Sequence, residues 1–180
     1  MASDALQKFI ARVRPIWGPL TSELVAECRG HLEALVTASP CEPWLADLRK
    51  AQPRNQELYR DPDHGFILLA HTEPAGLFRP PHDHGRGWVI YAMQRGEIEM
   101  RSYGRVEDPD GQVRLVRRDS SVIGAGQVQA YLPGDIHDTL CLSETALLFR
   151  FTDRDLKVED RDRRLTRYVD RDGVWATAGA

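Results

Sequence analysis

The sequence predicts a mainly β domain, an antiparallel sandwich or barrel, with a helical segment at its N-terminal end. From about residue 56 onward, short apolar runs alternate with turn signals, which is typical of antiparallel β architecture. Before that point, apolar residues recur at spacings of three and four, which is typical of amphipathic helices. We expect a single domain over residues 1–180, with helices in 1–52, a barrel in 54–151 and a charged tail or hairpin in 152–180.

The composition is that of an ordinary globular domain, with 42% hydrophobic and 28% charged residues. A net charge of -3 gives no indication of nucleic acid or an anionic membrane as a partner. We find no apolar run of membrane-spanning length and no signal-peptide pattern. The three cysteines, Cys28, Cys41 and Cys141, lack metal-type spacing and indicate free thiols in a reducing compartment. We therefore expect a cytoplasmic protein.

Three helices are expected in the first 52 residues. Ser3 or Asp4 can cap the first helix, whose apolar face ends at Val13. A second helix is expected over about residues 21–38 and a short third one over 44–48. We expect these helices to pack on the outside of the sheet that follows.

The strands are short and separated by turns. Pro80-Pro81 indicates an edge or bulge at the barrel rim, and the run from Asp108 to Gly111 predicts a hairpin turn. A last hairpin is expected at residues 165–169 and 174–175. The expected strands are residues 65–71, 77–84, 88–94, 97–103, 113–116, 122–123, 127–132, 137–142 and 145–151.

Three histidines stand out as candidate metal ligands. Residues two apart on a strand project to the same face, so His82 and His84 are presented side by side. The turn from Pro133 to Ile136 delivers His137 at the start of a later strand. Neutral imidazole suits iron, zinc, copper or nickel. We predict a three-histidine metal site.

The His-x-His pair, Gly96 twelve residues after His84, and the run ending at His137 together resemble the two motifs of the cupin superfamily. That resemblance implies a double-stranded β-helix, or jelly-roll, barrel. The fuller cupin pattern has a glutamate a few residues after the second histidine, where this chain has residues 88–90, Trp-Val-Ile. A three-histidine set without glutamate resembles the cysteine dioxygenase and mercaptopropionate dioxygenase family. Those thiol dioxygenases bind Fe(II) and add O2 to a thiol sulfur, giving a sulfinic acid.

The resemblance covers about residues 54–151 and implies substrate-binding positions. Val89 stands where some members have a cysteine cross-linked to a tyrosine, and Phe149 and Phe151 align with the histidine and tyrosine of the family's relay. The family's carboxylate-binding arginine or glutamine precedes the first strand, which makes Gln56 and Arg60 the candidates here.

Strand alternation adds a prediction about the pocket wall. If Val89 faces the metal, Tyr91 and Met93 share its face, and we expect them to line an apolar pocket with Phe149 and Phe151. Tyr91 then offers a catalytic hydroxyl, or else is a core tyrosine whose hydroxyl is satisfied.

Two other polar side chains are expected outside the site. Arg150 should point away from the two phenylalanines and into solvent, and His71 is expected to be structural.

The leading hypothesis is an Fe(II)-dependent dioxygenase that uses O2 and a small-molecule thiol. An aromatic pocket would also suit cleavage of a carbon–carbon bond in a diketone, hydroxyketone or aromatic acid. A non-oxidative isomerase or lyase needs a general base, for which Tyr91 is the candidate. A metal-dependent sensor without turnover is the third class. The sequence leaves the substrate and the oligomeric state open.

Overall fold

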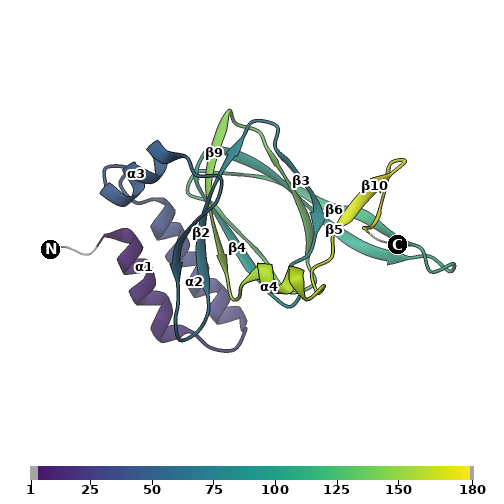
Figure 1. Cartoon of the computed structure of the whole chain (residues 1–180), viewed down its shortest axis with the longest axis horizontal. Helices are drawn as coiled ribbons and strands as arrows, with labels where there is room; N and C mark the ends of the chain where they lie inside the picture. Colours follow the sequence, from purple (N-terminus) through teal and green to yellow (C-terminus); the bar gives the residue numbers. More distant parts are fainter. Residues whose placement is uncertain (1–3, 179–180) are drawn as a thin grey trace.

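The computed structural model describes residues 4–178 of the 180-residue chain, and Figure 1 shows a barrel of two sheets with helices on one side. One sheet has five strands in the order β1-β2-β9-β4-β7, and the other has four in the order β3-β8-β5-β6. All pairings are antiparallel. The mainly β barrel predicted from the sequence is confirmed.

Most helices come first along the chain and the barrel strands follow, with one further helix after the last barrel strand. The helical elements are α1 (Ala5–Val13), η1 (Arg14–Ile16), α2 (Ser22–Val36), α3 (Pro43–Ala51) and α4 (Leu156–Arg161). The barrel strands are β1 (Gln56–Arg60), β2 (Ile67–Pro74), β3 (Phe78–His82), β4 (Val89–Arg95), β5 (Glu97–Glu107), β6 (Val113–Gly124), β7 (Val128–Tyr131), β8 (Ile136–Cys141) and β9 (Thr145–Thr152). A separate hairpin consists of β10 (Tyr168–Arg171) and β11 (Val174–Thr177).

The first three helices cover the outer face of the five-stranded sheet, as the sequence predicts (Figure 1). The Asp4 side chain accepts a hydrogen bond from the Gln7 amide and caps α1, while Ser3 lies outside the described residues. Thr21 caps α2 in the same way, through the Leu24 amide. No helix in the described part of the chain is long and apolar enough to cross a membrane.

Some strands differ from the sequence-based expectation. β6 is continuous over twelve residues rather than split in two, and β1 extends the five-stranded sheet at an edge where no strand was expected. The predicted final hairpin is present as β10 and β11. The segment before it contains α4, a helix that the sequence analysis does not predict. β1 and β6 are edge strands with largely polar sequences. Pairing with the neighbouring strand supplies the stabilisation that side-chain burial does not.

The register between β4 and β9 decides which side chains face the barrel interior. Phe149 lies opposite Ala92, and Phe151 lies opposite Ile90, whereas Arg150 lies opposite Tyr91. Directly opposed residues on antiparallel strands project to the same face. Phe149 and Phe151 therefore enter the core beneath the helices, and Arg150 faces inward with Tyr91.

These positions correct two expectations. Phe149 and Phe151 do not line the metal-side pocket, and Arg150 does not point into solvent. The alternation along the strand was correct, but its phase relative to the barrel was wrong. Apolar residues occupy both faces of β9, because one face meets the barrel interior and the other meets the helices.

Gly96 shows why the motif between β4 and β5 requires glycine. Its φ of 81° lies in the left-handed region, and a Cβ there would come 2.7 Å from the Thr145 carbonyl oxygen. The tight turn places β5 across the barrel from β4, so that Met93 and Ile98 pack in one interior cluster.

Candidate metal centre

The three predicted histidines meet on the inner side of the barrel. His82, the last residue of β3, pairs directly with His137 on β8, and His84 follows in the loop after β3. One ring nitrogen from each histidine lies within 4.8 Å of the others. His84 and His137 are 1% and 0% exposed. The cluster thus combines two adjacent strands with one loop.

The ring nitrogens have the arrangement that a shared metal ion needs. His82 Nδ1 donates to the Pro80 carbonyl oxygen at 2.9 Å, which leaves Nε2 of that neutral ring as an acceptor. His84 Nε2 and His137 Nε2 are 3.3 Å apart. Two nitrogens bound to one ion at about 2.0–2.1 Å lie roughly 3–3.5 Å apart, so this separation fits a common ion.

Burial keeps these rings uncharged. It lowers the pKa of His82, and it lowers the pKa of His84 and of His137 well below the ordinary value, because an imidazolium loses its hydration inside the barrel. Neutral imidazole is the form that binds a metal. No carboxylate joins the cluster within residues 4–178, so three neutral ligands would leave the ion's full charge in place.

The loop that carries His84 is held by the C-terminal segment. Asp83 Oδ1 accepts from the Gly85 amide at 2.9 Å and from the Thr166 amide at 2.8 Å. Glu159 on α4 accepts from the Arg86 amide at 3.1 Å and pairs with Arg164 at 2.9 Å. Residues predicted to form a solvated tail therefore organise the metal-binding loop.

The Glu159 carboxylate comes very close to the loop at Gly85. Its φ is 62°, and a Cβ would lie 2.7 Å from Glu159 Oε2. Only glycine combines that backbone conformation with so close an approach of the carboxylate.

Replacing Glu159 with glutamine is expected to destabilise the protein by about 1.5–3 kcal/mol, because charged hydrogen bonds to Arg164 and the Arg86 amide are weakened. The Arg164 side chain holds the Glu159 pKa at about 2, below its ordinary 4.5. A lowered folded-state pKa stabilises above the unfolded value and loses that stabilisation as pH falls toward the folded value.

Urea denaturation of both proteins between pH 7 and pH 2 measures the effect. The difference in unfolding free energy should be complete above about pH 5 and shrink toward pH 2. A difference that is independent of pH would contradict the assigned role of the carboxylate.

Two further contacts orient the third ligand. The Tyr131 ring stacks on His137 with centroids 3.9 Å apart and an interplanar angle of 19°. The next residue, Asp138, is fully buried and accepts from Arg101 at 2.9 Å and from the Tyr103 hydroxyl at 2.6 Å. The stacked Tyr131 ring restricts the orientation of the imidazole, and the bonds of Asp138 hold β8 at the residue next to His137.

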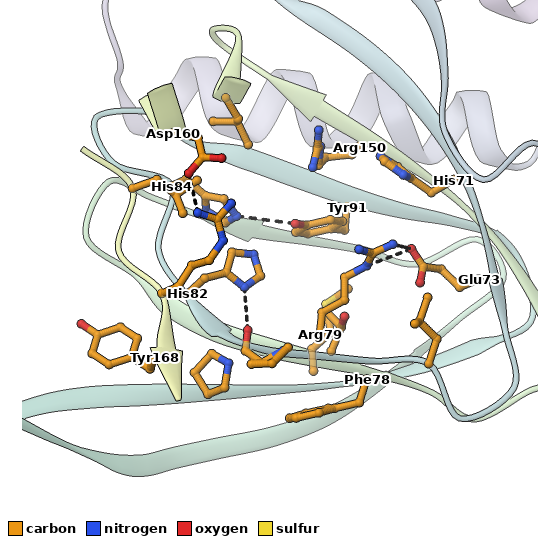
Figure 2. A pocket seen from close by; sticks show the side chains of 18 of the residues that line it. His71, Glu73, Phe78, Arg79, His82, His84, Tyr91, Arg150, Asp160 and Tyr168 are labelled. Carbon is orange, nitrogen blue, oxygen red and sulfur yellow. Dashed lines mark hydrogen bonds and ion pairs between the residues drawn. The ribbon is translucent and has the colours of Figure 1, made fainter. Parts of the chain in front are cut away.

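His82 and His84 of the histidine cluster line one end of a pocket of about 580 Å³. Figure 2 shows His82 and His84 at that end, Tyr91 and Arg150 next to them, and His71 with Glu73 farther along. The Tyr91 hydroxyl lies 3.5 Å from His84 Nε2. Tyr91 thus lies beside the histidine cluster, as the sequence predicts, and lines the pocket.

Burial raises the pKa of Tyr91, and the nearby Arg150 guanidinium only partly offsets this. The hydroxyl is therefore protonated at neutral pH. His84 Nε2 lies within hydrogen-bond reach of the hydroxyl, so the proton lies at the end of the pocket that holds the histidines.

The remaining predicted substrate-binding residues lie elsewhere. Val89 and Met93 share the interior face with Tyr91, but they belong to the buried cluster between the sheets and do not line the pocket. Gln56 and Arg60 are exposed on β1, and Arg60 pairs with Glu57 and Asp155. Neither of these two residues lines the pocket, so the carboxylate-binding position inferred from the resemblance is not found on β1.

The pocket contains two residues that sequence reasoning placed outside it, His71 and Arg150. Strand alternation groups His71 with Glu73, and it separates Arg150 from its two phenylalanine neighbours. That signal was present in the sequence. The inward direction became known only from the pairing of β2, β9 and β4.

Comparisons with known proteins find solved structures of partly similar shape. No family model and no curated protein matches the chain. Among solved structures, the Cnp3 cupin domain of Schizosaccharomyces pombe superposes with a TM-score of 0.44 at 13% identity, covering 59% of this chain and 64% of that domain. This chain therefore spans somewhat less than two thirds of the Cnp3 domain.

Two bacterial structures are similar at the same level. KdgF from a Halomonas species gives a TM-score of 0.46 at 16% identity, covering 58% of this chain and 81% of KdgF. An uncharacterised double-stranded β-helix protein from Klebsiella pneumoniae gives 0.42 at 14% identity, with coverages of 56% and 71%.

Proposed function

We propose that this protein is an Fe(II)-dependent dioxygenase that adds O2 to a small thiol and releases a sulfinic acid. The convergence of three neutral histidine nitrogens beside a pocket that His82 and His84 line, without a carboxylate in the cluster among the described residues, carries the proposal. Three imidazoles suit Fe(II), and His82, His84 and His137 would hold it. Bound there, Fe(II) would supply the centre at which O2 and the thiol sulfur react.

The reaction balances without another reductant. Both oxygen atoms of O2 become bonded to sulfur, which is oxidised by four electrons while O2 is reduced by four. The thiol proton remains with the sulfinic acid or passes to solvent. Substrate and O2 are thus the only reactants required.

The chain's own residues contribute charge and proton placement. A cation held by three uncharged ligands would keep its full charge, and together with the Arg150 guanidinium it would favour an anionic substrate such as a thiolate. Tyr91 holds a proton beside the metal end and can donate a hydrogen bond to a substrate atom there. The pocket's wall of β2, β9 and β4 is covered by helices on its far side, which excludes water from that direction.

The carbon–carbon-cleaving alternative depended on an aromatic wall containing Phe149 and Phe151, and these residues lie in the outer core instead. A non-oxidative isomerase or lyase gains one specific observation. His71 is a buried neutral imidazole in the pocket with an unpaired Nε2, and such a group can act as a general base.

The test is anaerobic Fe(II) reconstitution of the purified protein, followed by O2-electrode measurements with cysteine, 3-mercaptopropionate, small diketones and hydroxyketones. We expect bound iron near one per chain and one O2 consumed per sulfinate formed. Bound iron without O2 uptake for any thiol would reject the proposal. Anaerobic exchange of a substrate proton with solvent, abolished by His71→Phe, would favour the non-oxidative class.

Tyr91→Phe is expected to lower kcat by about 100-fold, because the only change is loss of the hydroxyl beside His84. KM and iron content should stay within about threefold of the original values. Steady-state O2 uptake measures both kinetic constants. Tyr131→Phe is the matched control, because it removes a buried hydroxyl that does not line the pocket and retains the ring on His137. Equal kcat values in the two variants would remove Tyr91 from the mechanism.

A further inference from the structure

Outside the histidine cluster, two nitrogens of pocket-lining residues are buried without a hydrogen-bond partner among residues 4–178. They are Arg150 Nε and His71 Nε2. Both residues line the pocket, and Figure 2 shows Arg150 beside Tyr91 and His71 next to Arg150, on the side away from His84. Buried polar atoms in native proteins are nearly always paired, so two adjacent unpaired nitrogens indicate a bound polar group.

Arg150 is built into the middle of the pocket wall. It lies on β9, directly opposite Tyr91 on β4 and Leu69 on β2. The other two arginines of the pocket are neutralised, Arg79 by Glu73 at 2.7 Å and Arg167 by Asp160. Arg150 has no ion-pair partner in the described chain, and a planar guanidinium matches a carboxylate.

Arg150 is a hydrogen-bond donor, whereas His71 offers the pocket a hydrogen-bond acceptor. It is 8% exposed, and burial with the nearby Arg150 and Arg79 charges lowers its pKa to about 3. The ring is therefore neutral, and its Nε2 has no partner in the described chain. With the ring proton on Nδ1, Nε2 is an acceptor on the side of the pocket.

We propose that Arg150 and His71 bind the end of the substrate that lies away from the metal, and that this end is a carboxylate with a hydroxyl or amino group on the adjacent carbon. The carboxylate accepts from Arg150, and the neighbouring O–H or N–H donates to His71 Nε2. A simple carboxylate would leave His71 unpaired. The inference rests on the proposed function only in taking the metal-bound end to be a thiolate.

The binding test uses Co(II)-loaded protein, in which a thiolate-to-cobalt absorption band reports thiol binding without O2. Ethanethiol, 3-mercaptopropionate, 3-mercaptolactate and cysteine are titrated in turn. We expect Kd to fall about 10- to 100-fold when the carboxylate is added, as for a charged hydrogen bond. It should fall a further ~2- to 10-fold when the hydroxyl or amino group is added. Equal Kd values of the wild-type protein for ethanethiol and 3-mercaptopropionate would by themselves overturn the proposal.

Two variants separate the steps. Arg150→Gln should remove the gain from the carboxylate, and Arg150→Lys should restore part of it because the charge returns without the planar fork. His71→Phe should keep the carboxylate gain and remove the gain from the hydroxyl or amino group. Arg167→Gln is the control, since this exposed arginine is already paired with Asp160, and both gains should persist.

The cobalt ligand-field spectrum and the thermal midpoint establish that each variant is folded with its metal site intact. Unchanged gains in folded Arg150→Gln or His71→Phe protein would refute the assigned roles. The expected binding pattern without O2 uptake would reject the thiol oxidation and retain the subsite. O2 uptake with an unchanged kcat/KM for 3-mercaptopropionate in Arg150→Gln would do the reverse.

Discussion

His137→Ala is expected to lower metal affinity by at least about 100-fold, because loss of even an outer partner of a ligand costs 10- to 100-fold. His137 supplies the nitrogen 3.3 Å from His84 Nε2 and lies directly opposite His82 on the adjacent strand. Removing it leaves two ligands, one of them on a loop. Metal retained after gel filtration and metal titration by calorimetry measure the change, and O2 uptake should be lost with the metal.

His64→Ala serves as the control for this variant. His64 is exposed in the turn before β2 and is not part of the histidine cluster, so metal affinity should be unchanged. Circular dichroism establishes that both proteins are folded. Full metal occupancy in folded His137→Ala protein would show that the metal binds elsewhere and would remove the basis of the proposed function.

Phe151→Ala is expected to reduce the free energy of unfolding by about 3–5 kcal/mol, the usual cost of truncating a buried phenylalanine. Phe151 is fully buried where helices meet the five-stranded sheet. Its ring centroid lies 5.5–5.9 Å from those of four aromatic residues, and alanine would leave a cavity among them. These residues are Phe9, Trp17, Phe66 and Trp88.

Urea denaturation of the metal-free protein is the appropriate measurement, because bound metal would add its own stabilisation. Phe151→Leu fills most of the volume and should cost about 1–2 kcal/mol. Metal affinity and KM should be unchanged in the leucine variant. A raised KM with little loss of stability would instead place Phe151 in the substrate pocket, as the sequence alone suggested.

The cluster of three histidines could be predicted because the sequence features that indicate it are local. The spacing of His82 and His84 and the turn before His137 specify where each imidazole leaves the backbone. Helices α1 and α2 were predictable for the same reason, since their apolar spacing and capping residues lie within one segment. Tyr91 followed from alternation on a strand whose position relative to the histidines was already known.

The opposite wall of the pocket was predicted with the wrong phase. β9 is apolar on both faces, because Phe149 and Phe151 meet the helices while Ala146 and Leu148 meet the barrel interior. Alternation within such a strand cannot tell which face is inward, and a shift of one residue exchanges all side chains between faces. Arg150 was assigned to solvent for this reason.

The antiparallel barrel, the helical cover and the cluster of three histidines could be read from the sequence, since each depends on periodicity or turns within a short segment. The tertiary structure decided the substrate end of the pocket. Pairing of β9 with β2 and β4 brings Arg150 beside His71 and Tyr91, from strands far apart in the chain. Packing of α4 likewise brings Glu159 onto the loop of His84. Such contacts depend on long-range register, which the burial of two apolar faces at once selects.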